Sequence, residues 1–298
     1  MASPAARLRA LLQRPGILVT PGCYDALSAR LVERAGFEAT FMSGFSVAGA
    51  RLGLPDTGLI SYAEMLDQGR AICGAVSIPV IGDADTGYGN AVNVKRTVRG
   101  YAAAGFACAM IEDQLAPKRC GHTEGKEVVD RAEALTRIRA AVDARNEGAD
   151  ILIMARTDAN ATHGFEEAMW RLRAMADEGA DILVLEAPKS EAEMRAFCAG
   201  VAGPKMANMV EGGATPVLPP AALAEMGYKI ALYPVALLAA SIAAMADALA
   251  ALKAGRRPER AAPFAEIRDV VGFDAYRAEE DRYAAGPPAA RPKRLSSS

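Results

Sequence analysis

The sequence has no strong net charge, no even set of cysteines and no uninterrupted apolar run of membrane length. Its 34 basic and 36 acidic residues leave a formal charge of −2, which gives no basic field for nucleic acid and favours a small-molecule partner. The cysteines are odd in number and scattered along the chain, at Cys23, Cys73, Cys108, Cys120 and Cys198. This pattern is typical of reduced thiols, so we expect a cytoplasmic protein.

Targeting and membrane signals are equally scarce. The N-terminal stretch MASPAARLRALLQRPG lacks the apolar segment of a signal peptide, so we expect neither export nor membrane insertion. The Ala-rich stretch 235–252 comes closest to a membrane span, but Asp247 interrupts it. We expect a buried helix there.

The chain does contain a regular alternation of short apolar runs and amphipathic segments of helical length, which predicts βα units with parallel strands. The predicted strands lie near residues 17–20, 39–42, 80–82, 107–111, 151–155, 182–185, 205–207 and 229–231. The predicted helices lie near residues 26–35, 62–76, 91–104, 131–147, 165–178, 191–199 and 220–226, and a long helix starts at Val235. Five of these helices end in a glycine stop, at Gly36, Gly105, Gly148, Gly179 and Gly227.

Eight such units in 298 residues favour a (β/α)₈ barrel over an open doubly wound sheet, and no G-x-G-x-x-G follows the first predicted strand. We expect the barrel to span residues 1–255. A helical extension should follow at 256–285, with a disordered tail at 286–298. Helices added after a completed barrel have no core of their own, so we expect them to pack on a neighbouring subunit.

Two aspartates follow the third predicted strand in the stretch IGDADTGYG. Residues two apart on a strand point to the same side, so Asp83 and Asp85 should leave the strand end together. Paired oxygen ligands at a strand end suggest Mg²⁺ or Mn²⁺, and the alternative is a polar turn.

In a (β/α)₈ barrel the carboxyl ends of the strands form the active face, so polar residues at those ends should converge. Arg156 is a natural partner for a substrate carboxylate because its guanidinium can donate two parallel hydrogen bonds. The converging residues are Tyr24, Asp25, Ser43, Gly44, Phe45, Asp83, Asp85, Glu112, Asp113, Arg156, Thr157, Asp158, Glu186, Asn208 and Glu211.

A long loop after the fourth predicted strand carries Lys118-Arg-Cys-Gly-His122. Two cations before Cys120 and an imidazole after it should lower the pKa of the thiol or prepare it to donate a proton. A zinc site fits poorly because C-x-H has the wrong spacing and too few partners, and a structural cysteine is unusual in so charged a loop.

Three motifs together resemble the isocitrate lyase/phosphoenolpyruvate mutase superfamily, and within it the carbon–carbon lyase branch. They are Asp83-Ala-Asp-Thr-Gly-Tyr-Gly89, Ile111-Glu-Asp-Gln114 and Lys118-Arg-Cys-Gly-His122, and the resemblance extends over about residues 15–255. It implies a (β/α)₈ barrel, a Mg²⁺ site, a mobile loop, and a tetramer that exchanges its last barrel helix between subunits.

The resemblance also implies roles for individual residues. Metal-site acids are Asp83, Asp85 and Glu112, with Asp56 nearby. Ser43, Gly44 and Phe45 match a cradle for the 2-oxo acid end of the substrate. Carboxylate-binding positions are Gly121, His122, Arg156, Glu186 and Asn208. Cys120 matches the catalytic acid, Lys118 belongs to its loop, and the base is either Tyr24 or a metal-site carboxylate.

The expected reaction is a Mg²⁺-dependent cleavage of a 2-hydroxy dicarboxylate of the 2-alkylmalate type, giving a 2-oxo acid and a carboxylic acid. Methylisocitrate-cleaving relatives carry an arginine shortly after the position of Pro234, whereas this chain continues Val-Ala-Leu-Leu-Ala239. A third substrate carboxylate would therefore lack its partner, which is costly. Phe45 also replaces a glycine found in many lyases. The alternatives are methylisocitrate cleavage, oxaloacetate decarboxylation, phosphonate mutase or hydrolase chemistry, and a barrel that only binds a metabolite.

Overall fold

A computed structural model describes residues 2–120 and 125–284 of the chain. The chain divides into two compact units, Met1–Ala246 and Asp247–Ser298. This boundary falls inside a helix, whereas the sequence predicts one at residue 255. The predicted tail, 286–298, lies outside the described residues.

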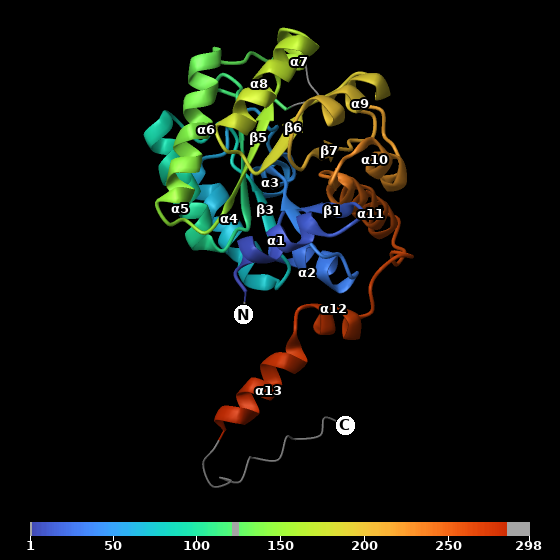
Figure 1. Ribbon diagram of the computed structural model, residues 1–298. Helices are drawn as coiled ribbons and strands as arrows, with labels where there is room; N and C mark the ends of the chain where they lie inside the picture. Colours follow the sequence, from blue (N-terminus) through green and yellow to red (C-terminus); the bar gives the residue numbers. More distant parts are fainter. Residues whose placement is uncertain (1, 121–124, 285–298) are drawn as a thin grey trace, which may run out of the picture. The chain divides into compact units, whose positions relative to one another are not determined.

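The first unit is built on parallel strands that run in the order β6-β5-β4-β3-β2-β1-β8-β7 within the described part of the chain. A parallel bridge between Leu183 and Lys205 joins the two edge strands and nearly closes the barrel (Figure 1). The predicted eight-stranded parallel barrel is thus confirmed in its nearly closed form. The strands are β1 (Leu18–Cys23), β2 (Thr40–Met42), β3 (Val80–Asp83), β4 (Cys108–Glu112), β5 (Leu152–Thr157), β6 (Ile182–Leu185), β7 (Met206–Asn208) and β8 (Ile230–Tyr233).

Helices surround the strands on the outside of the barrel (Figure 1). The helices that alternate with the strands are α2 (Ala26–Arg34), α4 (Tyr62–Ala75), α5 (Ala91–Ala104), α6 (Arg131–Asn146), α8 (Phe165–Asp177), α9 (Glu191–Gly200), α10 (Pro220–Met226) and α11 (Ala236–Lys253). All the alternating helices agree with the sequence to within a few residues. The glycines predicted to end five of them all have positive φ, as a left-handed helix stop requires.

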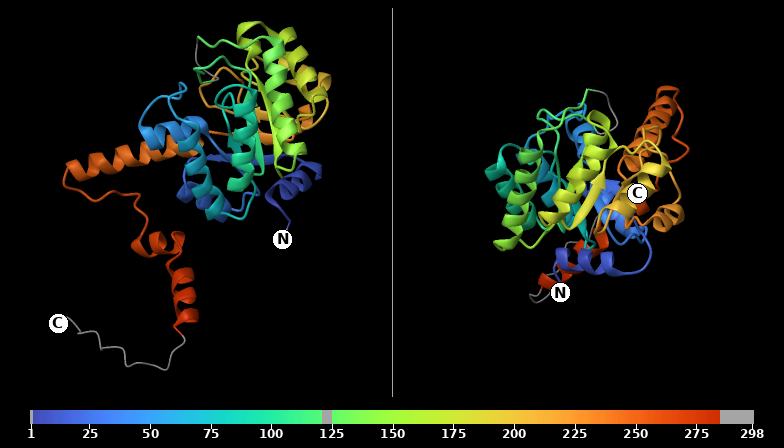
Figure 2. Two further views of the ribbon diagram at one scale, coloured as in Figure 1. Left: turned by 90° about the vertical axis from the view of Figure 1, so that its left-hand side faces the viewer. Right: turned by 45° about the horizontal axis from the view of Figure 1, so that its top comes forward.

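Four short helical elements were not predicted from the sequence. They are α1 (Pro4–Gln13), α3 (Gly44–Val47), the π-helical turn η1 (Ala48–Leu52) and α7 (Ala159–Thr162). The largest of them, α1, begins at the side-chain cap of Ser3 and buries Ala5 and Leu8. These two side chains belong to the cluster that fills the inside of the barrel, so α1 closes one end of it (Figure 2).

Alternation along the strands separates two hydrophobic layers. One set of strand residues, including Ile81, Met110, Met154 and Val184, fills the barrel interior. The intervening residues pack outward against the helices. Because side chains alternate between faces, Asp83, Glu112, Arg156, Glu186 and Asn208 continue the inward set at the carboxyl ends of their strands.

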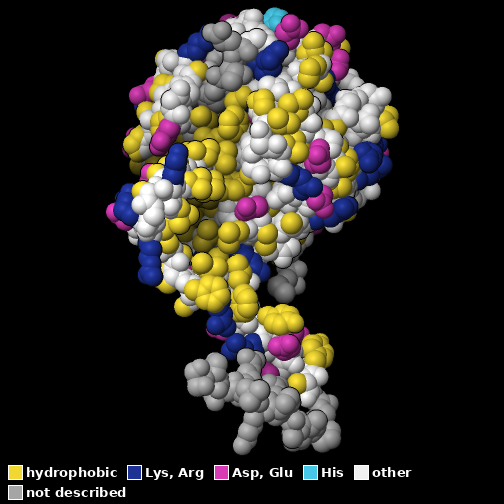
Figure 3. All heavy atoms as spheres, turned by 180° about the vertical axis from the view of Figure 1, so that it is seen from behind, with side chains coloured by type: hydrophobic (Ala, Val, Ile, Leu, Met, Phe, Trp, Pro, Cys, Tyr) yellow, Lys and Arg dark blue, Asp and Glu magenta, His cyan; other side chains and the backbone are white. Residues whose placement is uncertain are grey.

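The expectation of a buried helix at 235–252 is wrong for the single chain. Of the side chains on α11, only that of Ala251 is buried, and Ile242 and Met245 are more than half exposed. By length and a mean hydropathy of 1.6 this helix could cross a membrane, which by itself is weak evidence. Large apolar side chains are also exposed on α2, at Leu27 and Leu31. Hydrophobic side chains gather over one face of the protein in Figure 3.

The second unit contains the end of α11 followed by α12 (Phe264–Val270) and α13 (Phe273–Tyr283). Neither α12 nor α13 buries a side chain. This agrees with helices that lack a core of their own, as the sequence suggests. Exchange of a helix between subunits is not shown by a single chain.

Candidate active site

A cavity of about 350 Å³ opens at the carboxyl ends of the strands. Its floor is apolar and is made by Phe41, Met110, Met206 and Leu232, which belong to the inward-facing layer. The other side chains that line it are mostly polar or charged: Ser43, Asp56, Asp83, Lys118, Arg119, Cys120, Arg156, Glu186, Asn208 and Glu211. The barrel therefore brings most of the predicted site residues to one cavity.

Lys118 occupies the acidic corner of this cavity. Its Nζ lies 2.5 Å from Asp56 Oδ1 and 2.8 Å from Asp85 Oδ1, and all three side chains are about 5% exposed. Burial lowers the pKa of Lys118, but Asp85, Asp83 and Asp56 outweigh that effect and raise it well above its usual value. The neighbouring acids therefore favour the charged ammonium form of Lys118.

The two aspartates of IGDADTGYG reach this corner by a different geometry from the one predicted. Strand β3 ends at Asp83, and Asp85 lies beyond it with a φ of 47°. Aspartate tolerates this left-handed conformation better than most residues. The backbone N–H of Asp85 donates to Asp83 Oδ1 at 3.1 Å, so a turn gathers the two carboxylates.

Gly44 contributes to the site through Asp83. Its N–H donates to Asp83 Oδ2 at 3.2 Å, and it does not line the cavity as the predicted cradle requires. A Cβ at this position would lie 2.6 Å from the same oxygen, so only glycine fits beside the carboxylate. Ser43 and the half-exposed Phe45 do line the cavity.

The buried acids fit a divalent cation. Burial, followed by the nearby Asp85 carboxylate, raises the pKa of Asp83 to about 6. Burial also raises the pKa of Glu112 well above its usual value despite Arg156, and Glu112 Oε1 has no hydrogen-bond partner among the described residues. A bound cation would neutralise desolvated carboxylates of this kind.

Direct ligation by many side chains is not what the site offers. Within residues 2–120 and 125–284, no three histidine, cysteine or acidic groups come together as a metal-binding cluster. Mg²⁺ characteristically uses one or two carboxylates and keeps several waters, so a single carboxylate such as Asp83 with water-mediated partners is sufficient.

Arg156 is buried at the cavity wall with acids on three sides. Its Nε and Nη2 donate to Asp158 at 2.9 and 3.1 Å, while Glu112 and Glu186 lie 3.4 and 3.5 Å away. Asp158 also receives Lys126 Nζ at 3.0 Å. The predicted fork of Arg156 is thus already used by Asp158, and Nη1, which has no closer acid than Glu112 at 3.4 Å, is the nitrogen best placed for a substrate.

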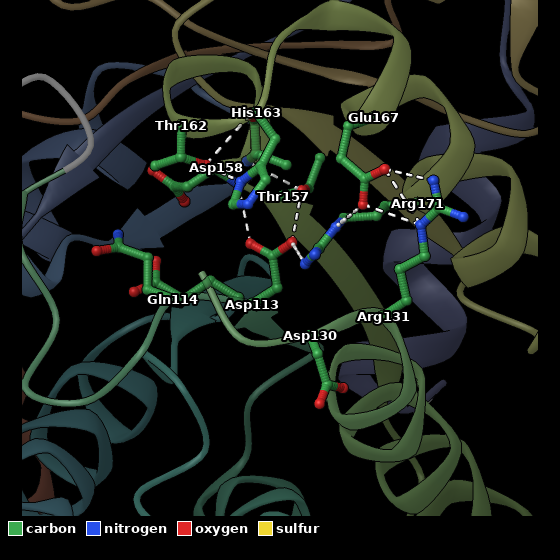
Figure 4. A network of polar contacts seen from close by, with 12 residues as sticks. Asp113, Gln114, Asp130, Arg131, Thr157, Asp158, Thr162, His163, Glu167 and Arg171 are labelled. Atoms are coloured by element: carbon green, nitrogen blue, oxygen red, sulfur yellow. Dashed lines mark hydrogen bonds and ion pairs between the residues drawn. The ribbon is translucent and has the colours of Figure 1, made fainter. Parts of the chain in front are cut away.

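A second buried acid, Asp113, holds the end of β5 that carries Arg156 (Figure 4). It accepts hydrogen bonds from Thr157 Oγ1 at 2.6 Å and from the N–H of Asp158 at 2.9 Å. Arg171 Nη1 from α8 lies 3.0 Å from the same carboxylate. The sequence places Asp113 and Asp158 at strand ends, but their part in holding Arg156 depends on contacts that only the fold reveals.

Glu186 and Asn208 lie side by side at the ends of β6 and β7. Asn208 Nδ2 donates to both carboxylate oxygens of Glu186, at 3.1 and 3.3 Å. Asn208 Oδ1 is buried without a hydrogen-bond partner. Asn208 lines the cavity and has an acceptor oxygen to offer there, whereas a carboxylate-binding position requires a donor.

The reactive loop is described up to Cys120, which is partly buried and lines the cavity. Gly121 and His122 lie outside the described residues. Tyr24, by contrast, does not line this cavity. Its hydroxyl is 2.7 Å from Ser241 on α11, and it lines a separate cavity between α2 and α11. This geometry argues against Tyr24 as the base.

The match to known proteins covers the same part of the chain as this barrel and its site. A protein-family description, phosphoenolpyruvate phosphomutase, matches residues 8–253. The chain belongs to the phosphoenolpyruvate mutase/isocitrate lyase superfamily. The resemblance inferred from the three motifs is thereby confirmed.

Individual members of the superfamily are similar over most of their length. 2,3-Dimethylmalate lyase from Eubacterium barkeri is 44% identical over 287 residues, covering 95% of this chain and 99% of that protein. 2-Methylisocitrate lyase from Aeropyrum pernix is 44% identical over 241 residues, covering 81% of this chain and 77% of that protein. Relatives of this kind are carbon–carbon lyases, and the prediction of an enzyme is confirmed.

Solved structures show the same fold with ligands. Oxaloacetate acetylhydrolase in complex with 3,3-difluorooxalacetate has a TM-score of 0.90 and 38% identity, covering 94% of this chain and 97% of that one. Phosphonopyruvate hydrolase in complex with oxalate and Mg²⁺ has a TM-score of 0.84 and 32% identity, covering 95% and 99%. The magnesium expectation is therefore supported for the superfamily.

Proposed function

We propose that this chain is a Mg²⁺-dependent lyase that cleaves a 2-hydroxy dicarboxylate of the 2-alkylmalate type, such as 2,3-dimethylmalate, to a 2-oxo acid and a carboxylic acid. The observation that carries the proposal is one cavity that unites a buried acid cluster, a guanidinium and a thiol. Its volume of about 350 Å³ suits a small dicarboxylate.

Asp83 would hold the metal directly, with Asp56, Asp85 and Glu112 as further or water-mediated partners. Mg²⁺ supplies Lewis-acid stabilisation at the oxygen from which a proton is lost, and Mn²⁺ could replace it. Lys118 keeps the acid cluster from repelling itself and adds positive charge at the cavity edge.

The remaining steps are assigned to side chains along the cavity. Arg156 binds a substrate carboxylate and stabilises the negative charge that moves onto it when the C2–C3 bond breaks. Asn208 Oδ1 accepts a hydrogen bond from a substrate hydroxyl. His122 and Gly121 are proposed as further carboxylate partners on the strength of the motif. Cys120 then donates a proton to the carbon of the departing fragment. A carboxylate of the acid cluster is the base that fits the geometry.

The choice of a dicarboxylate rests on the wall beyond β8. Pro234 and Val235 line the cavity there and offer no cation, while Ala239 lies farther along α11 and does not line it. The alternative of methylisocitrate cleavage has one point in its favour, because Arg119 lines the same cavity and could meet a third carboxylate. Oxaloacetate is a second alternative, given the similarity to oxaloacetate acetylhydrolase.

Replacing Cys120 with serine tests the role of the thiol. Cys120→Ser should lose most of kcat, because a hydroxyl is a much weaker acid than a thiol, while oxalate still binds with Mg²⁺ in a thermal-shift titration. Unchanged turnover would rule out Cys120 as the acid. Loss of oxalate binding as well would show a damaged cavity instead of a missing proton donor.

We further propose a cytoplasmic homo-oligomer, with a tetramer as the expected number. None of the five cysteines, all of them described, forms a disulfide, which suits a reducing compartment. Ile242 and Met245 of α11 and Leu27 and Leu31 of α2 leave apolar surface that a second copy of the chain could cover. A monomer in light scattering at micromolar concentration would refute the oligomer.

A further inference from the structure

The side chain of Gln114 makes two hydrogen bonds to the backbone of one residue of the reactive loop, Arg119. Its Nε2 donates to the carbonyl oxygen of Arg119 at 2.9 Å, and its Oε1 accepts from the N–H of Arg119 at 2.9 Å. The side chain is buried, with Gln114 only 1% exposed. Arg119 immediately precedes Cys120, so these two bonds hold the peptide groups on both sides of Arg119, including the one that leads into the thiol residue.

The backbone of Gln114 is itself held firmly. Arg137 Nη1 donates to the carbonyl of Gln114 at 2.7 Å, and Gln114 pairs with Val128 in an antiparallel bridge. Next to it, the N–H of Leu115 donates to Glu127 at 2.8 Å. In Figure 4 the side chain of Gln114 extends away from the network of Asp113. The side-chain amide of Gln114 is thus carried by a backbone segment that is itself fixed by hydrogen bonds.

The loop between Gln114 and Cys120 is also held at Lys118. A Cβ on Gly58 would lie 3.2 Å from the backbone N of Lys118, so the Asp56 segment packs directly against this part of the loop. Lys118 in turn reaches Asp56 and Asp85. These contacts fix residue 118, and the amide of Gln114 fixes residue 119.

We propose that Gln114 is a positioning residue that sets the place of Cys120 in the cavity through the backbone of Arg119. The amide of Gln114 donates to the carbonyl and accepts from the N–H of the same residue at once, which neither an ionised carboxylate nor a thioether can do. A glutamate keeps the acceptor and loses the donor, and a methionine of similar length loses both. The catalytic part of this inference rests on the proposed role of Cys120, while the positioning part does not.

The test compares Gln114→Met and Gln114→Glu with Leu115→Ala, a matched change of an exposed side chain in the same loop. Two readouts are measured: kcat and KM for 2-oxo acid release, and the rate at which iodoacetamide alkylates Cys120, followed by peptide mass spectrometry. Loss of two net hydrogen bonds should change kcat and the alkylation rate of Cys120 by about tenfold, with KM changed less than about threefold. Gln114→Glu should fall between Gln114→Met and the control.

A double-mutant cycle separates positioning from general damage to the fold. If Gln114 acts through the thiol, Gln114→Met should cost no further activity in a Cys120→Ser background. Additive losses, or a Cys120 alkylation rate equal to that of Leu115→Ala, would overturn the proposal. If no substrate is cleaved at all, the proposed function fails, and the alkylation rates still decide whether Gln114 positions Cys120. If Gln114→Met does not fold, Gln114→Glu carries the same comparisons.

Discussion

The most informative perturbation outside the cavity wall is Asp158→Asn. Asp158 is fully buried and accepts two hydrogen bonds from Arg156 and one from Lys126. Asparagine keeps the shape but has one oxygen and an NH₂ group in place of two charged oxygens. One N–H of Arg156 or Lys126 would then face a donor, and two buried cations would lose their shared counter-ion.

The magnitude follows from these contacts. Removing one partner of a buried ion pair costs about 3–5 kcal/mol, because the remaining charge stays desolvated. Some of this cost should appear as lower stability to urea. The change should also let Arg156 move toward Glu112 and Glu186. A displacement of a binding group by about 1 Å lowers kcat/KM by about a hundredfold.

The assay pairs urea unfolding, with and without Mg²⁺, with kcat/KM for 2-oxo acid release. Glu178→Gln is the matched control. Glu178 accepts two hydrogen bonds, from Nε and Nη2 of Arg139, as Asp158 does from Arg156. This pair lies on the surface, where the side chain of Arg139 is 58% exposed. That change should cost less than about 1 kcal/mol and leave turnover intact. An Asp158→Asn enzyme that matches this control in both measurements would refute the reasoning.

Two further predictions concern the metal site. Gly44→Ala places a Cβ against Asp83 and should weaken Mg²⁺ binding about tenfold in isothermal titration, whereas Gly74→Ala, with nothing within 4 Å, should leave it unchanged. Equal affinities in the two variants would remove Asp83 from the metal site. In the metal-free protein the pKa of Asp83 is about 6 in the folded state and ~3.9 in the unfolded state. The contribution of Asp83 to the free energy of unfolding is therefore complete below pH ~3.9 and is lost as the pH rises through about 6. Mg²⁺ needs the deprotonated carboxylate, so the rise in Tm that Mg²⁺ causes over EDTA should grow between about pH 5 and pH 7, and a rise that is independent of pH would contradict this.

The order of strands and helices could be predicted because each unit repeats the same short-range signals. Apolar runs mark the strands, and glycine stops such as Gly105 and Gly227 mark the helix ends. The helix α1 escaped prediction because its apolar residues pack under the barrel, a contact that no local pattern specifies. The exposure of α11 was not predicted because an apolar sequence does not specify whether its own chain buries the helix.

The site was predictable where a motif or a strand end marks a residue. Asp83, Arg156 and Cys120 line one cavity as expected. Tyr24 also follows a strand, but its hydroxyl bonds to Ser241 in another cavity, because the direction of a side chain after a strand end depends on the turn. Asp158 has an ordinary place in the sequence, and only the bidentate contact with Arg156 shows its importance.

The central claim is the substrate class. It is tested most directly by 2-oxo acid release from 2,3-dimethylmalate, 2-methylmalate, 2-methylisocitrate, isocitrate and oxaloacetate, each with Mg²⁺ and with EDTA. The account predicts turnover of an alkylmalate with Mg²⁺ and none with EDTA. Cleavage of the tricarboxylates alone would show that the apolar wall at Pro234 and Val235 does not exclude a third carboxylate, and reaction of oxaloacetate alone would contradict a lyase that uses Cys120 as its acid.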